Sequence, residues 1–275
     1  MRTLWKGAVS FGLVNIPVNM YVATERKDIK FNYLHRECMS PVKYKKYCPA
    51  CQRELASEEI VRGYEYQKDQ YVIINDEDME RIPLENTKTI DILDFVDITQ
   101  LDPIYFDKTY YLEASRGGEK AYRLLIQAME QTGKAAVAKV LIRTKQSLAA
   151  LRIKEKVLVM ETIFYPDEIR SPASLNPGMD GVKLHDNEIS MAVSLIQNLS
   201  TDFDPVKYQD EYRQALWEMI EAKAAGKEIV TSPLSDVKGN VVDLMEALKA
   251  SIQLSEEKRK ETPDKKPKRR KKTGT

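Results

Sequence analysis

Four side chains that commonly bind metals lie close together near the N-terminus: all three cysteines and one of only two histidines. Their spacing is His35-x2-Cys38-x9-Cys48-Pro-Ala-Cys51. Thiolate and imidazole ligands two residues apart in short turns, facing a second such pair, suit tetrahedral zinc. Four protein ligands leave no open position for a substrate, so the spacing predicts a structural zinc site at residues 35–51.

The alternative for Cys48 and Cys51 is a thioredoxin-like redox pair. No βαβ pattern follows these residues, and a redox pair would leave His35 and Cys38 without a role. An odd number of cysteines in a chain without an export signal fits a reducing compartment. Lys6, Asn15 and Pro17 interrupt the N-terminal apolar stretch, so no signal-peptide core is left, and no run of about 18 apolar residues occurs. We therefore expect a cytoplasmic protein without a membrane span.

Catalytic motifs are few. The chain has no glycine-rich phosphate loop and no GxSxG elbow, and it offers only two histidines as general bases. One enzyme alternative is a metal-dependent nuclease built from Asp167 and the Glu221-x-Lys223 pair. Such a motif needs its Glu and Lys on a strand, whereas this segment has a helical pattern. The sequence predicts a protein that is not an enzyme.

Basic charge is concentrated at the C-terminus. The whole chain has a net charge of +1, but residues 263–275 hold seven Lys or Arg and one Asp, which leaves −5 for residues 1–262. A charged segment without apolar residues cannot collapse, so it predicts a disordered arm attracted to polyanions, or simply a solubilising tail. Its cations are Lys265, Lys266, Lys268, Arg269, Arg270, Lys271 and Lys272.

A second set of cations punctuates two predicted strands in the middle of the chain. Basic side chains on strands can follow a phosphate backbone without reading bases, or they can form an ordinary solvated face. The candidates are Lys134, Lys139, Arg143, Lys145 and Arg152, with Gln146 at the turn.

The elements that must position these groups are mostly strands up to about residue 166. In residues 5–21 the apolar residues alternate and then change parity after Gly12, which predicts a strand with a bulge or a barrel corner. Residues 59–66 and 70–75 predict a hairpin, and residues 103–112 a further strand. A helix is expected at residues 119–132, followed by strands at 135–144, 146–154 and 157–164. At 43% hydrophobic residues, the chain can bury a sizeable core.

Beyond residue 181 the period becomes helical. A first apolar stripe contains Ile189, Val193 and Ile196, and Asp204-Pro205 predicts the start of a second helix. Asn240 predicts the start of a third. A lone helix of about four turns is marginal in water, so its apolar stripe indicates either a docking peptide for a partner or packing onto the chain's own barrel. That stripe consists of Val241, Leu244, Leu248 and Ile252.

The order of several motifs resembles the bacterial Ku family, the homodimeric counterparts of the eukaryotic Ku heterodimer that binds broken DNA ends. The motifs are WKGAVSFGLVNIPVNMY from residue 5, GYEY from 63, DPIYFDKTYYL from 102, KAYRLLIQAMEQTGKAAVAKVLIRTKQSLAALR from 120, YPDEIR from 165 and YRQALWEMIEAKAAGKEI from 212. Together they span nearly the whole chain.

The resemblance implies a fold that is mainly β with α: a β-barrel core over residues 1–186 with a helical C-terminal arm, assembled as a ring-forming homodimer. It also implies sequence-independent binding of double-stranded DNA ends in double-strand break repair by non-homologous end joining, at the nucleoid. Residues 187–226 would form the dimerisation arm, with Tyr208, Tyr212, Leu216, Trp217 and Met219 at the interface.

The same resemblance implies that residues 227–255 form a linker and a helix that docks the ATP-dependent DNA ligase D, with residues 256–275 as the basic tail. The strand cations would then contact phosphate in a DNA channel. Besides the nuclease, one alternative remains open, a zinc-stabilised protein-interaction module without affinity for DNA.

Overall fold

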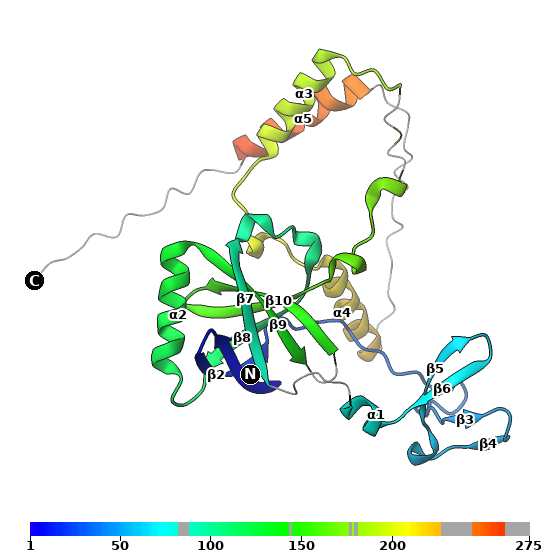
Figure 1. The fold of residues 1–275 in the computed structure, drawn as a ribbon. Coiled ribbons are helices and arrows are strands. Elements are labelled where there is room, and N and C mark those ends of the chain that lie inside the picture. The colour runs from blue at the N-terminus through cyan, green and yellow to red at the C-terminus, as the bar shows by residue number, and fades with distance from the viewer. Residues whose placement is uncertain (82–87, 143–144, 176–177, 179–180, 227–243, 262–275) are drawn as a thin grey trace, which may run out of the picture. The chain divides into compact units, whose positions relative to one another are not determined.

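The chain folds as two units, Met1–Pro172 and Ala173–Thr275, which are described separately. The computed structural model in Figure 1 describes residues 1–81, 88–142, 145–175, 178, 181–226 and 244–261. The boundary between the units falls before residue 186, where the sequence predicted the end of the core.

Seven strands of the first unit close into a barrel, in the spatial order β1-β2-β8-β11-β10-β9-β7. All neighbours are antiparallel except β1 and β7, which pair in parallel and complete the closure. This confirms the predicted barrel class. The strands are β1 (Trp5–Phe11), β2 (Val14–Val22), β7 (Thr89–Asp97), β8 (Phe106–Ala114), β9 (Lys134–Ile142), β10 (Lys145–Lys154) and β11 (Val157–Ile163).

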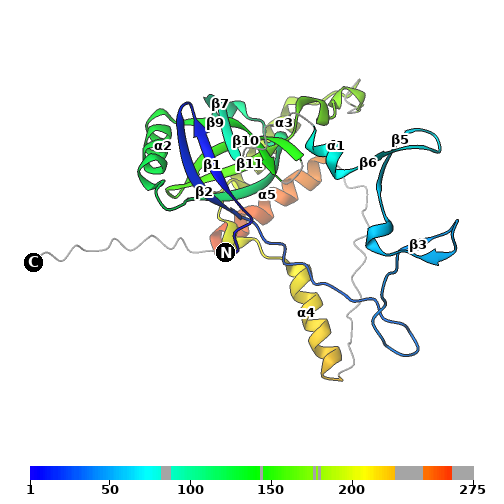
Figure 2. The ribbon, with the colours of Figure 1, turned by 60° about the horizontal axis from the view of Figure 1, so that its bottom comes forward.

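The N-terminal segment is a hairpin and not the single bulged strand that the sequence predicted. Strands β1 and β2 pair in antiparallel register from Phe11 opposite Val14 back to Trp5 opposite Met20. Gly12, with φ of 59°, turns the chain within two residues. The change of parity therefore marks a tight turn, after which the apolar side chains face the same core again. Figure 2 shows this hairpin, in blue, as one wall of the barrel.

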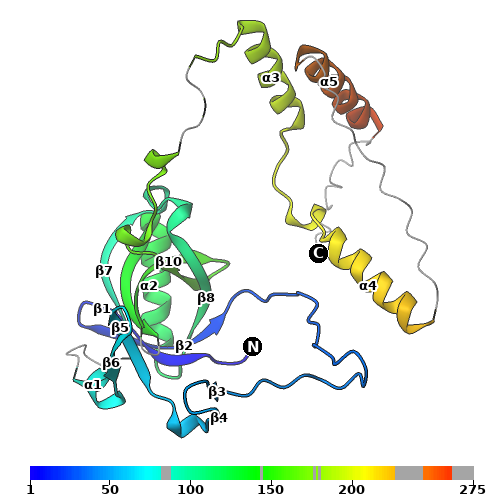
Figure 3. The same ribbon diagram turned by 90° about the vertical axis from the view of Figure 1, so that its right-hand side faces the viewer.

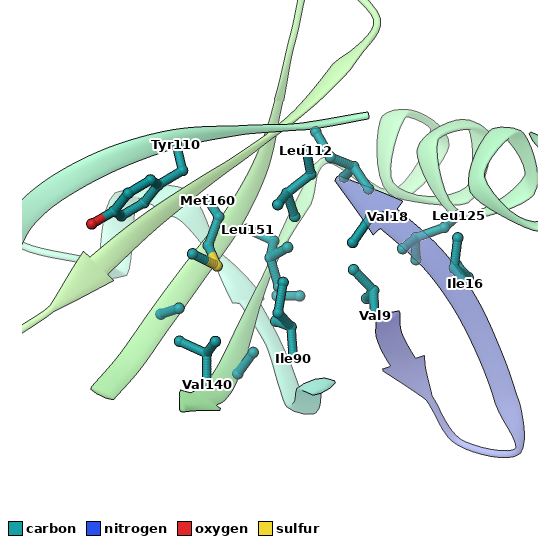
Figure 4. Close-up of a cluster of buried hydrophobic side chains, with 14 of the residues drawn as sticks. Val9, Ile16, Val18, Ile90, Tyr110, Leu112, Leu125, Val140, Leu151 and Met160 are labelled. Carbon is teal, nitrogen blue, oxygen red and sulfur yellow. The ribbon is translucent and has the colours of Figure 1, made fainter. Parts of the chain in front are cut away.

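The core fills the barrel and extends to one helix, α2 (Glu119–Thr132). This helix lies where the sequence predicted it and ends at Gly133, whose φ of 65° suits the left-handed conformation of a C-cap. Leu125 and Met129 of α2 pack against side chains from the strands. Figure 4 shows the cluster, which includes Val9, Ile16, Val18, Ile90, Tyr110, Leu112, Val140, Leu151 and Met160.

The closure of the barrel brings β1 very near to the chain that enters β7. The Ala8 N–H donates to the Lys88 carbonyl oxygen at 2.9 Å, and Ala8 lies opposite Thr89. A Cβ atom on Gly7 would overlap the same Lys88 oxygen and the ring of Trp5. Glycine at position 7 therefore allows the backbones to approach at this seam.

Residues 23–88, which we call the extension, connect β2 to β7. They contain two small hairpins and a short helix: β3 (Tyr47–Cys48) with β4 (Arg53–Glu54), β5 (Arg62–Gln67) with β6 (Gln70–Ile74), and α1 (Asp76–Glu80). The second hairpin is the predicted one, and its turn contains Asp69 with φ of 62°. No residue that the structure describes in this segment is buried.

The second unit consists of three helices, α3 (Asp186–Leu199), α4 (Glu211–Ala224) and α5 (Leu244–Glu261). Helices α3 and α5 lie side by side, as Figures 1 and 3 show. Leu195 of α3 and Leu248 and Ile252 of α5 are half-buried, whereas much of the predicted α3 stripe, including Val193 and Ile196, stays exposed. Helix α5 therefore has a partner within its own unit.

Two predicted helix limits differ from the structure. Asp204 caps only a short 3₁₀ turn through the N–H of Val206, and α4 begins at Glu211, where Asp210 accepts from the N–H of Arg213 at 2.9 Å. Helix α5 runs past the predicted limit at residue 255, and its predicted start at Asn240 lies outside the described residues. Of the helices in the described ranges, none is both long and apolar enough to cross a bilayer.

Candidate nucleic-acid interface

The predicted cations of the barrel lie on two adjacent antiparallel strands, β9 and β10. Ala138 and Val140 point into the core, so Lys139 between them points outward and is exposed. The register places Lys139 opposite Leu148 and Gln146 opposite Leu141, which puts Lys139 and Gln146 on the same outer face. Arg143 lies outside the described residues, as do the predicted cations at 265–272.

Arg152 lies on the same outer face but is already held by a partner. Its Nε and Nη2 atoms donate to the two carboxylate oxygens of Glu161 at 3.0 and 2.7 Å, and Glu161 is buried. This hydrogen bonding raises the pKa of Arg152 above its ordinary value. A two-pronged pair at a partly buried site fixes the guanidinium, because breaking it would leave a buried carboxylate unpaired. Of the predicted cations within the described ranges, Arg152 is therefore the least available for phosphate.

Lys134 and Lys145 lie at strand ends and form exposed ion pairs. The Lys134 Nζ atom lies 2.9 Å from a carboxylate oxygen of Asp97, and the Lys145 Nζ atom lies 3.3 Å from Glu168. The N–H of Tyr165, and then Lys145, lower the pKa of Glu168. Exposed pairs of this kind contribute little to stability, so a phosphate group can replace the carboxylate.

Lys139 differs from these cations. In the described part of the chain it forms no ion pair, although its register neighbour on β7 is Asp91. Among the predicted strand cations that the structure describes, Lys139 is thus the one most open to an external anion.

Sequence reasoning missed a second polar surface, at the β10–β11 turn, where Glu113 and Glu155 lie beside two lysines. Lys154 and Lys156 line an open cavity of about 770 Å³ together with Tyr21, Tyr111 and Tyr122. Aromatic and basic side chains together are typical of nucleic-acid surfaces, but here the two glutamates balance the lysines and Glu113 accepts from the Tyr21 hydroxyl at 2.7 Å. Only the pairing of β2 with β8 and of β8 with β11 brings these residues together, so no local pattern could have indicated the group.

The four predicted metal ligands form two separate pairs. His35 Nδ1 lies 3.1 Å from Cys38 Sγ. Cys48 and Cys51 also interact: the N–H of Cys51, then its thiol, lower the pKa of Cys48, while the Cys48 sulfur raises the pKa of Cys51. Across the ranges that the structure describes, no three His, Cys, Asp or Glu side chains are grouped to hold a metal. The structure brings each pair together but leaves the two pairs apart.

The predicted interface residues lie on or beside α4. Tyr212, with 78% of its surface exposed, and Trp217, with 51%, project from a helix that has no buried residue in the described unit. Leu216 and Met219 are half-buried, and Tyr208, which precedes the helix, stacks on Phe203 with ring centroids 5.7 Å apart. Of the predicted ligase contacts, Leu244, Leu248 and Ile252 lie on α5, and Val241 lies outside the described residues.

The nuclease alternative has no matching framework. Asp167 lies in the 3₁₀ turn Pro166–Glu168, and Glu221 and Lys223 lie on α4. The Glu and Lys of such a motif would need to share a strand, and here both belong to a helix.

Comparison with known proteins decides the family. The chain matches the Ku70/Ku80 beta-barrel domain over residues 10–191, a range that includes all of β2, the extension, and β7 to β11. The chain belongs to the Ku family. The predicted resemblance is thereby confirmed.

Several curated Ku proteins are similar along most of this chain, each with the name non-homologous end joining protein Ku. The one from Heliobacterium modesticaldum is 48% identical over 272 residues, which cover 98% of this chain and 99% of that protein. The one from Bacillus subtilis is 45% identical over 265 residues, covering 96% and 85%. The one from Symbiobacterium thermophilum is 52% identical over 260 residues, covering 94% of this chain but 64% of that protein. These names mention no enzymatic activity.

Proposed function

We propose that the chain binds double-stranded DNA ends as a homodimeric ring in non-homologous end joining, and that it recruits an ATP-dependent DNA ligase, ligase D. The observation that carries the proposal is the closed barrel, matched by the Ku domain over residues 10–191. The Ku proteins to which the chain is similar supply the link to end joining.

A ring explains how a protein can select DNA ends without reading bases. A closed loop of protein can be threaded only from an end, so topology selects the substrate while the contacts stay on phosphates. The exposed Lys139 and the weakly paired Lys134 and Lys145 suit such contacts. By strand alternation Lys139 lies on the outer face, whereas Lys134 and Lys145 have the core-facing parity of β9 and β10 and would reach phosphate from the strand ends.

The exposed aromatic side chains of the second unit favour a second copy as the partner. Tyr208, Tyr212 and Trp217 are large and exposed, and no residue of α4 is buried in the single chain. Exposed aromatic side chains of this size mark interaction surfaces, and tyrosine and tryptophan are the residues that most often anchor interfaces. A homodimer would bury them against the partner copy.

The ligase contact and the basic tail remain proposals from the sequence. Helix α5 offers the exposed Leu244 and Leu254 beside its contact with α3. Deletion of residues 244–261 should abolish stimulation of the ligase and leave retention on linear DNA unchanged. Loss of DNA retention in that variant would contradict a dedicated docking role for α5.

The proposed function is tested by binding to matched linear and covalently closed circular duplexes of one sequence, at moderate salt and with magnesium present. We expect tight retention of intact linear DNA and little retention of circles. A linear duplex with both ends blocked by bound streptavidin serves as the control, because a ring cannot pass over the block. Equal binding to all three substrates would refute the ring, and degradation of the linear duplex would favour the nuclease.

The channel cations are tested by the double variant Lys139→Gln and Lys145→Gln. If both contact phosphate, the plot of log binding constant against log salt concentration should become less steep, by the amount expected for the loss of about two phosphate contacts. The matched control is Lys120→Gln, an exposed lysine on α2. An unchanged salt slope in the double variant would place the DNA on another surface, for which Lys154 and Lys156 are the next candidates.

A further inference from the structure

A cavity of about 770 Å³ opens on the outer face of the barrel where β2, β8 and the β10–β11 turn meet. Tyr21 of β2 lies directly opposite Tyr111 of β8, and the alternate residues Met20 and Leu112 are buried in the core. Both tyrosines therefore point outward and give the cavity an aromatic wall. A cavity of this size is within the range of pockets that bind small organic ligands, about 300–1,000 Å³.

A third lining tyrosine, Tyr122 of α2, separates two strands beside the cavity. Its hydroxyl donates to the Leu112 carbonyl oxygen at 2.6 Å and accepts from the Leu158 N–H at 2.9 Å. Leu112 and Leu158 lie opposite each other on β8 and β11, so the hydroxyl stands between backbone groups of two paired strands. The strand ends beyond it, at Glu113 and Val157, line the cavity. The opening is therefore built into the packing of α2 against the barrel.

The turn between β10 and β11 brings charged side chains to the cavity through a strained backbone. Lys154 pairs with Val157, so Glu155 and Lys156 form a two-residue turn, with φ of 50° and 68°. Asparagine and glycine are the usual residues in such turns, because other side chains are strained at positive φ. Strained residues of this kind cluster at functional sites. The turn thus keeps a lysine and a glutamate where other residues would fold more easily.

The charged groups of the cavity differ in how far they are already paired. Lys154 and Lys156 are exposed, and within the described ranges neither forms an ion pair. Glu113 accepts from the Tyr21 hydroxyl at 2.7 Å and still has acceptor capacity. Because Glu113 and Glu155 balance the two lysines, the cavity does not favour a bare polyanion. It suits a ligand that carries both an anionic group and hydrogen-bond donors.

A nucleotide combines the groups that this cavity can recognise. Tyrosine rings stack on nucleobases, lysine ammonium groups bind phosphate, and a carboxylate accepts from sugar hydroxyl or base amino groups. We infer that the cavity binds a nucleoside monophosphate unit, with its base against Tyr21 and Tyr111 and its phosphate at Lys154 and Lys156. The unit can come from a free nucleotide or from an unpaired nucleotide at the end of a DNA strand. This inference does not depend on the proposed function, because it requires neither a ring nor a duplex.

Calorimetric titration of the full chain with AMP, adenosine and inorganic phosphate tests the shared chemistry. We expect a single saturable site for AMP, and binding at least about tenfold weaker for adenosine and for phosphate, since each lacks one of the two main contacts. The double variant Lys154→Gln and Lys156→Gln should weaken AMP binding at least about tenfold. The matched control is Lys108→Gln, an exposed lysine on β8 that does not line the cavity, which should bind AMP like the wild type.

Three further variants separate loss of binding from loss of folding. Tyr111→Leu should weaken AMP binding, whereas Tyr111→Phe keeps the ring and should retain it. Lys156→Gly removes a cation and relieves the positive φ, so it should raise the unfolding midpoint while it weakens AMP binding. Damage to the fold cannot produce that combination. AMP binding that is unchanged in both Tyr111→Leu and Lys156→Gly would overturn the assignment.

A duplex with a single-stranded overhang that carries 2-aminopurine distinguishes the two sources of the unit. If a DNA end supplies it, the fluorescence of the overhang base should fall on binding to the wild type but not on binding to Tyr111→Leu. If a free nucleotide is the ligand, AMP should bind in the titration while the overhang fluorescence stays the same in both proteins. The inference is refuted by the absence of both signals, or by inorganic phosphate that binds as tightly as AMP.

Discussion

The barrel and the extension belong to the same unit of the chain, but they are stabilised in different ways. In the barrel, strands far apart in sequence pair with each other and enclose a cluster of fully buried side chains. In the extension, each hairpin pairs neighbouring residues, and no described residue is buried. Since buried apolar surface is the main source of folding stability, the barrel can hold its own structure and the extension needs support from outside its sequence neighbours.

The two regions also differ in their polar contacts. In the barrel, the Tyr122 hydroxyl donates to the Leu112 carbonyl at 2.6 Å and accepts from the Leu158 N–H at 2.9 Å, in a partly buried site. In the extension, Arg53 and Glu59 form a two-pronged ion pair at the surface. The same type of polar contact should therefore contribute to global stability in one region and only to local order in the other.

The largest effect on stability should come from adding a side chain where β1 meets β7 at the seam of the barrel. Gly7→Ala would place a Cβ atom against the Lys88 carbonyl oxygen and the Trp5 ring, and a backbone oxygen cannot turn away as a side chain can. We expect a loss of about 3 kcal/mol or more in the free energy of unfolding, or failure to fold. Urea unfolding followed by circular dichroism measures the change.

The matched control is Gly63→Ala in β5 of the extension. A Cβ atom there would meet Tyr71 at 3.5 Å, an ordinary contact distance. We expect a change within about 0.5 kcal/mol. Equal losses in the two variants would mean that the extension and the barrel share one core after all, which would remove the difference between the regions.

Much of the barrel could be predicted because its signals are local. Helix α2 has its apolar face and a terminal glycine within one stretch, and strands β9 to β11 follow one another through short connections. The parallel closure between β1 and β7 could not be predicted, because the pairing spans the whole extension and leaves no periodic pattern. The role of Gly7 depends on that same contact.

The sequence could predict which cations lie on strands, but not which of them are free to contact phosphate. The sequence indicates that Lys139 and Arg152 lie on strands, yet the pairing of β10 with β11 decides that Arg152 meets Glu161. The cavity beside Lys154 and Lys156 was missed for the same reason. Alternation along one strand gives the direction of a side chain, and only the neighbouring strand gives its partner.

An intermediate effect is expected from Tyr122→Phe in the barrel. The variant removes the hydroxyl that donates to Leu112 and leaves the N–H of Leu158, a fully buried residue, without its partner. We expect a loss of about 1–3 kcal/mol in the free energy of unfolding. Tyr64→Phe on the exposed β5 hairpin is the control and should change stability little. A neutral Tyr122→Phe variant would show that water replaces the hydroxyl.

The same tyrosine predicts how stability changes at high pH. Burial raises the pKa of Tyr122 above its ordinary value, so the folded state holds this proton more tightly than the unfolded state. Its contribution is complete below the unfolded pKa of about 10 and is lost as the pH rises through the folded pKa. The difference in stability between wild type and Tyr122→Phe should therefore narrow above pH 10. A difference that stays constant across this range would contradict the assignment.

The smallest effect is expected from Glu59→Gln in the extension. The Glu59 carboxylate accepts from Arg53 at 3.0 Å and from the Ala56 N–H at 2.9 Å, and these hydrogen bonds, that of Arg53 first, lower its pKa. Because the pair is exposed, we expect no measurable shift in global unfolding but faster tryptic cleavage at Arg53. Glu58→Gln, the adjacent exposed carboxylate, is the control and should leave cleavage unchanged.

The pH dependence of that cleavage sharpens the same comparison. A lowered pKa means that the ion pair supports local order above the usual glutamate pKa of about 4.3 and stops doing so as the pH falls through the folded value. An acid-stable protease should therefore cut wild type and Glu59→Gln at different rates near neutral pH and at similar rates in acid. A shift of the global unfolding midpoint in Glu59→Gln would instead show that the extension unfolds together with the barrel, because a local contact cannot move a transition in which its region takes no part.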